Sequence, residues 1–207
     1  MKHHLVFCAA ALLAATVPAA RSAEPASRPA SAAGHRDGDR LAASAPASAP
    51  ADTYKLTEWD ALIPKDWDPM KAVKGIGVLR LAAMGDADPK AMQALDELKR
   101  AWDSAPSEPS MDKARIRIPG FVVPLDAEGE TVHEFLLVPY FGACIHTPPP
   151  PANQVIHVTL AKPAKGLRMM DAIWVSGQLH TTISDTGLGT ASYRMDGVSV
   201  APYRERR

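Results

Sequence analysis

Apolar side chains recur along this chain at two different spacings, and the change from one to the other divides its folded part in two. The first spacing follows Asp88 and Pro89, residues that suit the N-cap and the first position of a helix. Apolar residues then recur at steps of three and four, namely Met92, Leu95, Leu98 and Trp102. This spacing places them on one face of a helix, and we expect that face to pack into the core.

From residue 112 onward, short apolar runs replace the helical spacing, and Gly, Asp and Pro residues separate them. The runs cover residues 115–125, 131–138, 154–160, 172–181, 191–195 and 198–201. Runs of this length are typical of β-strands, and a turn at Asp196 and Gly197 is expected between the last two. The pattern predicts a mainly β fold with one packed helix (α+β). We expect five to six antiparallel strands in a small barrel or sandwich, with an OB-like barrel as one form.

The N-terminus has the pattern of an export signal. Lys2 precedes an apolar run from Leu5 to Val17 that is short for a transmembrane helix, and small residues follow it. We predict a signal peptide over residues 1–22 and a periplasmic mature chain with no transmembrane segment. Cys8 lies inside the apolar run after Phe7, which is a poor setting for a lipoprotein cysteine.

Composition indicates how the rest of the chain is organised. Residues 23–53 are rich in Ala, Pro and Ser and contain no aromatic residue, so we predict a disordered linker there. One globular domain is expected over residues 54–203, with a helical strap at its start and a basic tail over residues 204–207. The 23 basic and 23 acidic residues give a formal net charge of zero, so charge does not indicate a nucleic-acid partner.

The strongest candidate site lies between the second and third predicted strands. Cys144 and His146 are two residues apart, so in extended backbone both side chains face the same side. A run of prolines follows them, and such a run is a stiff strut without internal hydrogen bonds. After cleavage of the signal peptide, Cys144 is the only cysteine. The candidate binding loop comprises Cys144, His146, Pro148, Pro149, Pro150, Pro151, Asn153 and Gln154.

The residues of this loop support two interpretations about equally. In the first, the loop binds zinc, because thiolate and imidazole are ligands that zinc prefers. The metal ligands would be Cys144, His146, His133 and His157. In the second, the loop is a rigid structural or partner-recognition element without a metal, and its two amide side chains bond buried backbone groups.

A thiol-dependent enzyme is a weaker third interpretation. No second cysteine is available in the mature chain to resolve a covalent intermediate on Cys144. The sequence also has no phosphate-binding glycine loop, nucleophile elbow or paired histidine–glutamate metalloprotease motif. We therefore do not expect an enzyme.

A family resemblance extends beyond the loop. It is carried by Gly120–Leu125, Glu134–Gln154 and Trp174–Gly177, with Trp59, Leu62 and Pro64 before them. These stretches resemble a bacterial family of exported proteins and lipoproteins of unknown function, domain of unknown function 3299, over residues 54–203. Some members neighbour zinc-regulated ABC-type transporter components. The resemblance implies an exported accessory or binding protein linked to zinc transport or homeostasis, with a membrane transporter component as partner. This chain departs from the lipoprotein members because it lacks a convincing lipobox.

Overall fold

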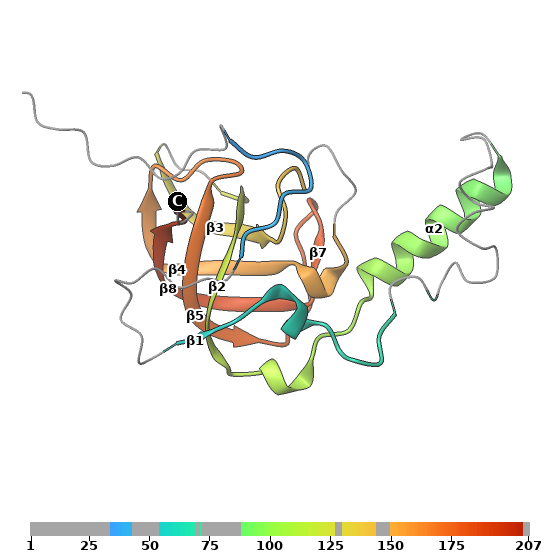
Figure 1. The fold of residues 1–207 in the computed structure, drawn as a ribbon, viewed down its shortest axis with the longest axis horizontal. Coiled ribbons are helices and arrows are strands. Elements are labelled where there is room, and N and C mark those ends of the chain that lie inside the picture. The colour runs from blue at the N-terminus through green and yellow to red at the C-terminus, as the bar shows by residue number, and fades with distance from the viewer. Residues whose placement is uncertain are drawn as a thin grey trace, which may run out of the picture.

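The structure is a computed structural model that describes residues 34–42, 54–68, 71, 88–126, 130–143 and 150–204. Its main feature is a β-barrel (Figure 1). The barrel strands are β2 (Arg115–Pro124), β3 (Thr131–Val138), β4 (Ile156–Lys165), β5 (Ala172–His180) and β8 (Tyr193–Pro202). They pair in the order β2-β3-β4-β8-β5, and β5 pairs with β2 to close the wall. The predicted mainly β fold with one helix is therefore confirmed.

The barrel is mixed, whereas the sequence pattern predicted antiparallel strands alone. β8 lies parallel to β4, and the short strand β1 (Lys55–Leu56) lies parallel to the start of β2. Between β5 and β8 the chain passes through a small hairpin of β6 (Ser184–Asp185) and β7 (Thr190–Ala191). This connection lets β8 enter the wall between β4 and β5, which is the strand order of an OB-like barrel.

The predicted turn at Asp196 and Gly197 does not form, because both residues lie inside the continuous strand β8. Gly197 is needed there for close packing rather than for a turn. A Cβ atom at Gly197 would lie 2.7 Å from Leu160 Cδ2 and 3.0 Å from Val158 Cγ1. Gly197, predicted from the sequence as part of a turn, is therefore the residue that allows β8 to approach β4 closely.

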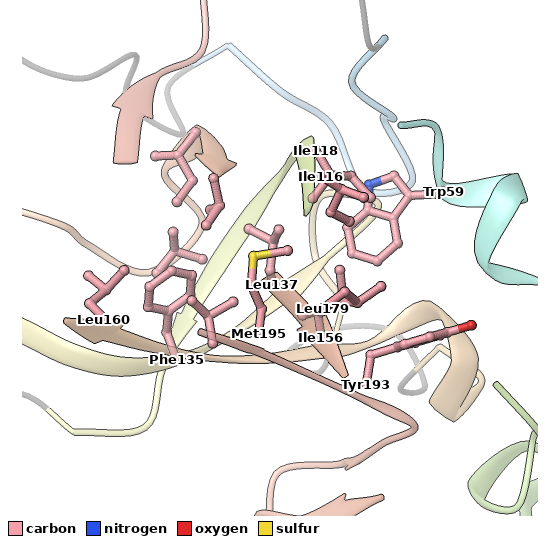
Figure 2. Close-up of a cluster of buried hydrophobic side chains, with 14 of the residues drawn as sticks. Trp59, Ile116, Ile118, Phe135, Leu137, Ile156, Leu160, Leu179, Tyr193 and Met195 are labelled. Carbon is pink, nitrogen blue, oxygen red and sulfur yellow. The ribbon is translucent and has the colours of Figure 1, made fainter. Parts of the chain in front are cut away.

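The barrel interior is filled by apolar side chains that alternate along the strands. Figure 2 shows the Trp59 and Tyr193 rings at one end of this cluster and Phe135 at the other. Tyr193 and Phe135 are fully buried, and Trp59 is 4% exposed. Ile118, Leu137, Ile156 and Leu179 fill the space between with no exposed surface. This interior cluster is the core that holds the strands in register.

Two connecting segments cover one end of the barrel. The first is the 3₁₀ turn η1 (Trp59–Leu62), and the second runs from Ala105 to the 3₁₀ turn η3 (Pro109–Met111). Trp59 Nε1 donates to the Pro119 carbonyl at 2.7 Å, which fixes η1 to β2. The second segment is fixed because Ser192 Oγ donates to the Ala105 carbonyl. The predicted helical strap at the start of the domain is therefore a short 3₁₀ turn that closes the barrel end.

A second apolar cluster lies on the outer face of the barrel, and an N-terminal segment contributes to it. The cluster includes Phe121, Val123, Leu136 and Val138 from β2 and β3. Leu41 joins it and is 5% exposed. Residues 34–42 thus pack on the barrel, although they lie within the predicted disordered linker over residues 23–53.

Helix α2 (Pro89–Asp103) begins where the sequence predicts, and Asp88 Oδ1 accepts a hydrogen bond from the Lys90 backbone N–H at 2.8 Å. Its apolar stripe, however, does not pack into the core. Met92 and Leu95 are 57% and 60% exposed, and Figure 1 shows α2 projecting away from the barrel. The helical spacing fixed which residues share a face but carried no information on what that face meets. No helix in the described part of the chain is long and apolar enough to cross a bilayer.

Candidate functional site

The structure describes the two ends of the predicted binding loop. Cys144, His146, Pro148 and Pro149 lie outside the described residues. Pro150 is buried, and Pro151 is half-buried at the start of the 3₁₀ turn η4 (Ala152–Gln154). The last two prolines therefore belong to the packed base of the loop.

The chain entering the loop is held against the N-terminal segment. Phe141 exchanges two backbone hydrogen bonds with it: its N–H donates to Asp39 O and its carbonyl accepts from Gly38 N, both at 2.9 Å. The Phe141 ring lies 5.6 Å from the Phe121 ring between centroids, in an edge-to-face arrangement. Gly142 has a φ of 85°, a conformation that favours glycine, and Ala143 has no exposed surface. This end of the loop is thus fixed in the outer apolar cluster.

The chain leaving the loop is held by two buried side-chain amides. Gln154 Nε2 donates to the Trp59 carbonyl at 2.9 Å, and Asn153 Nδ2 donates to the Pro106 carbonyl at 3.2 Å. Asn153 has no exposed surface and Gln154 is 4% exposed. Both residues therefore bond the backbone of the segments that cover the barrel end. This is the contact that the second interpretation of the loop assigned to them.

The amide network at the barrel end is only partly satisfied. The side-chain oxygens Asn153 Oδ1 and Gln154 Oε1 are buried and accept no hydrogen bond within the described part of the chain. Buried polar atoms without partners are uncommon in folded proteins, because each one costs free energy. Next to them, the buried Tyr193 hydroxyl donates to the Leu62 carbonyl at 2.7 Å. Burial raises the pKa of Tyr193 to about 12.

The two histidines predicted as additional metal ligands lie in different surroundings. His133 is exposed on β3, and its backbone N–H donates to Asp126 Oδ1 at 3.2 Å. The His157 side chain on β4 is only 13% exposed, and both of its ring nitrogens have partners. Among the described residues, no group of three or more His, Cys, Asp or Glu side chains is placed to hold a metal ion.

The partners of His157 come from two neighbouring elements. Nε2 lies 2.6 Å from Glu134 Oε1 on β3, and Nδ1 lies 3.0 Å from Ser184 Oγ on β6. An ionised carboxylate only accepts hydrogen bonds, so beside an ionised Glu134 a neutral imidazole carries its proton on Nε2. Nδ1 is then the acceptor, and the Ser184 hydroxyl donates to it. The three side chains form a continuous hydrogen-bonded series.

A cavity of about 330 Å³ opens beside this series. Its lining residues are Leu125, Glu134, His157, Asp185, Thr186 and Leu188. It therefore lies over β3 and β4, between the end of β2 and the connection from β5 to β8. In OB-type barrels, this face and these two connections commonly carry the ligand site.

Sequence reasoning identified His157 but missed Glu134 and Ser184. The alternation in β4, with buried Ile156 and Val158 on either side, places the His157 side chain on the outer face. Its partners depend on strand pairing. Leu136 lies opposite His157 and Glu134 lies opposite Thr159, so Glu134 is a diagonal neighbour of His157 on the same face. The sequence of either strand alone does not reveal this pairing.

Comparison with known proteins adds a family assignment. The family model described as a protein of unknown function (DUF3299) matches residues 59–202. A solved structure, that of a DUF3299 family protein (PA4066) from Pseudomonas aeruginosa PAO1, is 32% identical to this chain with a TM-score of 0.53. The similarity covers 72% of this chain and 95% of the other. No curated protein matches the chain.

Proposed function

The chain belongs to the DUF3299 family of proteins of unknown function, and from this premise we propose that it is an exported accessory protein that binds a protein partner through residues 144–149. The packing of the chain on either side of the loop supports the recognition part of the proposal, and the predicted signal peptide supports the periplasmic location. The family resemblance is what points to a membrane transporter component as the partner.

The observation that supports recognition is that both ends of the loop are fixed in packed structure. Ala143 at one end and Ala152 at the other are 0% and 1% exposed. Phe141 holds the entering chain to the N-terminal segment, and Gln154 holds the leaving chain to η1. A segment tied at both ends loses less conformational entropy when it binds, so more of its contact energy appears as affinity.

The residues between these ends suit protein recognition. Pro148 and Pro149 favour the extended polyproline conformation, which presents its side chains without internal hydrogen bonds. Prolines in this conformation dock into aromatic grooves of other proteins. Because Pro150 is buried, the part of the loop that we assign to the partner ends at Pro149.

Zinc binding by Cys144 and His146 is the second candidate function. The observation that favours it is the Glu134–His157 hydrogen bond, because metal-binding histidines commonly donate their second ring nitrogen to a carboxylate. Against it, His157 Nδ1 is engaged by Ser184, and zinc ligation by this nitrogen would break that contact. Recognition without a metal requires no such rearrangement, and we prefer it for that reason.

Site-specific crosslinking tests the recognition proposal. A photo-reactive benzoylphenylalanine replaces Thr147 in the full chain, and a control chain carries it at exposed Ser110 on η3. We expect ultraviolet light to join Thr147-substituted chain to one membrane transporter subunit, and the same adduct to form between the two purified proteins. Pro148→Ala with Pro149→Ala should reduce the adduct while the circular dichroism spectrum stays unchanged. Equal adducts from both positions, or none from position 147, would contradict the proposal.

Two further measurements separate the other parts of the proposal. Titration calorimetry with zinc compares the wild type with Cys144→Ser and His146→Ala. Micromolar or tighter binding that both substitutions abolish would favour the zinc function over metal-free recognition. For export, N-terminal sequencing of the protein from a periplasmic extract should find a mature chain starting within residues 21–24. An uncleaved chain in the cytosolic fraction alone would refute the predicted location.

A further inference from the structure

The hydrogen-bonded series on the outer face of the barrel has an arrangement that partner recognition does not require. We propose that Ser184, His157 and Glu134 form a nucleophile–base–acid relay that accepts an acyl group from a small carboxylic ester bound in the adjoining cavity. The three side chains come from β6, β4 and β3, so only the folded barrel brings them together.

The geometry meets the first requirement of such a relay, which is contact between nucleophile and base. Ser184 Oγ lies 3.0 Å from His157 Nδ1, within the reach of proton transfer. The second requirement is a group that orients the base, and Glu134 Oε1 lies 2.6 Å from Nε2. Compared with the common serine hydrolase arrangement, the two ring nitrogens exchange roles, because Nδ1 rather than Nε2 faces the serine.

The position of the His157 ring proton suits a base that accepts the proton of Ser184. With an ionised Glu134 accepting from Nε2–H of a neutral imidazole, Nδ1 has the free electron pair that receives the proton of the Ser184 hydroxyl. The His157 side chain is 13% exposed, and this shielding from water strengthens both of its hydrogen bonds. As Ser184 Oγ attacks, the imidazole becomes positively charged, and the Glu134 carboxylate stabilises that charge.

The acyl transfer balances in two steps. In the first, Ser184 Oγ forms a bond to the ester carbonyl carbon, its proton passes to His157 Nδ1, and the alcohol leaves with that proton. In the second, water attacks the acyl-serine, giving a proton to Nδ1 that then returns to Ser184 Oγ as the carboxylic acid departs. The sum is ester and water to acid and alcohol, with no other reactant.

The cavity indicates which esters fit. A volume of about 330 Å³ is at the small end of ligand sites. Leu125 and Leu188 contribute apolar surface, whereas Glu134 and Asp185 contribute carboxylates. Negative charge at the wall disfavours anionic substrates, so we assign the site to small neutral or cationic esters. The lining has no arginine or lysine that would pair with a phosphate.

A fluorophosphonate probe tests the proposal on the full chain, because it traps an activated serine irreversibly. The Ser184 Oγ–phosphorus bond forms, the phosphorus–fluorine bond breaks, and fluoride leaves while His157 takes the serine proton. Peptide mass spectrometry should locate the adduct on Ser184. Ser184→Ala should abolish it, and His157→Gln should slow it about 10²-fold or more, the usual effect of losing a general base. Glu134→Gln should slow it as well.

Ser110→Ala is the matched control, since the Ser110 hydroxyl bonds the Glu108 carboxylate instead of an imidazole. It should leave the rate of labelling unchanged. Circular dichroism and the unfolding midpoint check that each variant is folded, and Ser184→Cys provides a second variant that keeps a nucleophile beside His157. An unlabelled Ser184 in the folded wild type, or equal rates in wild type and folded His157→Gln, would overturn the proposal.

Discussion

Tyr193 and Leu62 are 131 residues apart in the chain, yet the Tyr193 hydroxyl donates a 2.7 Å hydrogen bond to the Leu62 carbonyl. The same hydroxyl accepts a hydrogen bond from the Glu108 backbone N–H. One buried oxygen thus joins the last barrel strand to both segments that cover the barrel end. In the chain, one of these segments comes before α2 and the other comes after it.

Tyr193→Phe should therefore destabilise the protein. The substitution keeps the buried ring but leaves the Leu62 carbonyl and the Glu108 N–H without this partner. We expect the free energy of unfolding, measured by urea denaturation at pH 7, to fall by about 1–3 kcal/mol. Tyr203→Phe is the control. The Tyr203 hydroxyl donates to Ala42 O at 3.1 Å, and Ala42 is exposed, so water can replace that bond and the loss should be smaller.

Alkaline pH should weaken the fold through the same hydroxyl. Burial raises the Tyr193 pKa from 10.0 to about 12, so above pH 10 the folded state retains a proton that the unfolded state releases. The contribution is intact below pH 10 and is lost between pH 10 and about 12. The slope is about 1.4 kcal/mol per pH unit. Denaturation midpoints across this range should show a steeper decline for the wild type than for Tyr193→Phe; parallel declines would contradict the assignment.

Gln154→Ala tests whether the leaving end of the loop is an anchor. It removes the donor to the buried Trp59 carbonyl but also removes Oε1, which accepts no hydrogen bond from the described residues, so we expect a net loss of about 1–2 kcal/mol in unfolding free energy. Gln178→Ala removes an exposed amide that donates to Lys113 O at 3.3 Å. That control should change stability by less than about 0.5 kcal/mol. Similar losses in both variants would show that Gln154 is not a special contact.

Leu95→Glu tests the exposure of the α2 stripe. Because Leu95 is 60% exposed, we expect its replacement to change the unfolding free energy by no more than about 0.5 kcal/mol. Leu179→Ala is the contrast, since Leu179 has no exposed surface in the barrel interior and should cost about 2–5 kcal/mol. A loss above 2 kcal/mol for Leu95→Glu, measured by urea denaturation, would mean that the stripe is buried in solution.

The sequence predicted the local elements of this fold well and their partners less well. The start of α2 followed from Asp88 and Pro89, because a cap and a fixed proline φ act within one turn. The parallel pairing of β4 with β8 did not follow, because strand order depends on contacts between residues far apart in the chain. Gly197 illustrates the limit: the same residue type serves tight turns and close strand packing.

For the candidate site, too, the local motif was predictable from the sequence and the distant partners were not. The proline run and the amides beside it were visible as a motif, and hydrogen bonding of Asn153 and Gln154 to buried backbone was one of the predicted roles. Their actual acceptors, at Pro106 and Trp59, lie 47 and 95 residues earlier in the chain. Glu134 and Ser184 were not identified, because only the folded register places them beside His157. Because the three side chains lie on three different strands, the sequence of any one strand contains no motif for them.

The position of β8 has a consequence for how the protein is made. It is the last strand in the described part of the chain, yet it lies between β4 and β5 and pairs with both. Until residues 193–202 have left the ribosome, neither β4 nor β5 can complete its pairing along that side. The newly made chain therefore cannot close its barrel before β8 has been made. Until then it stays open to chaperones and to any machinery that moves unfolded chains.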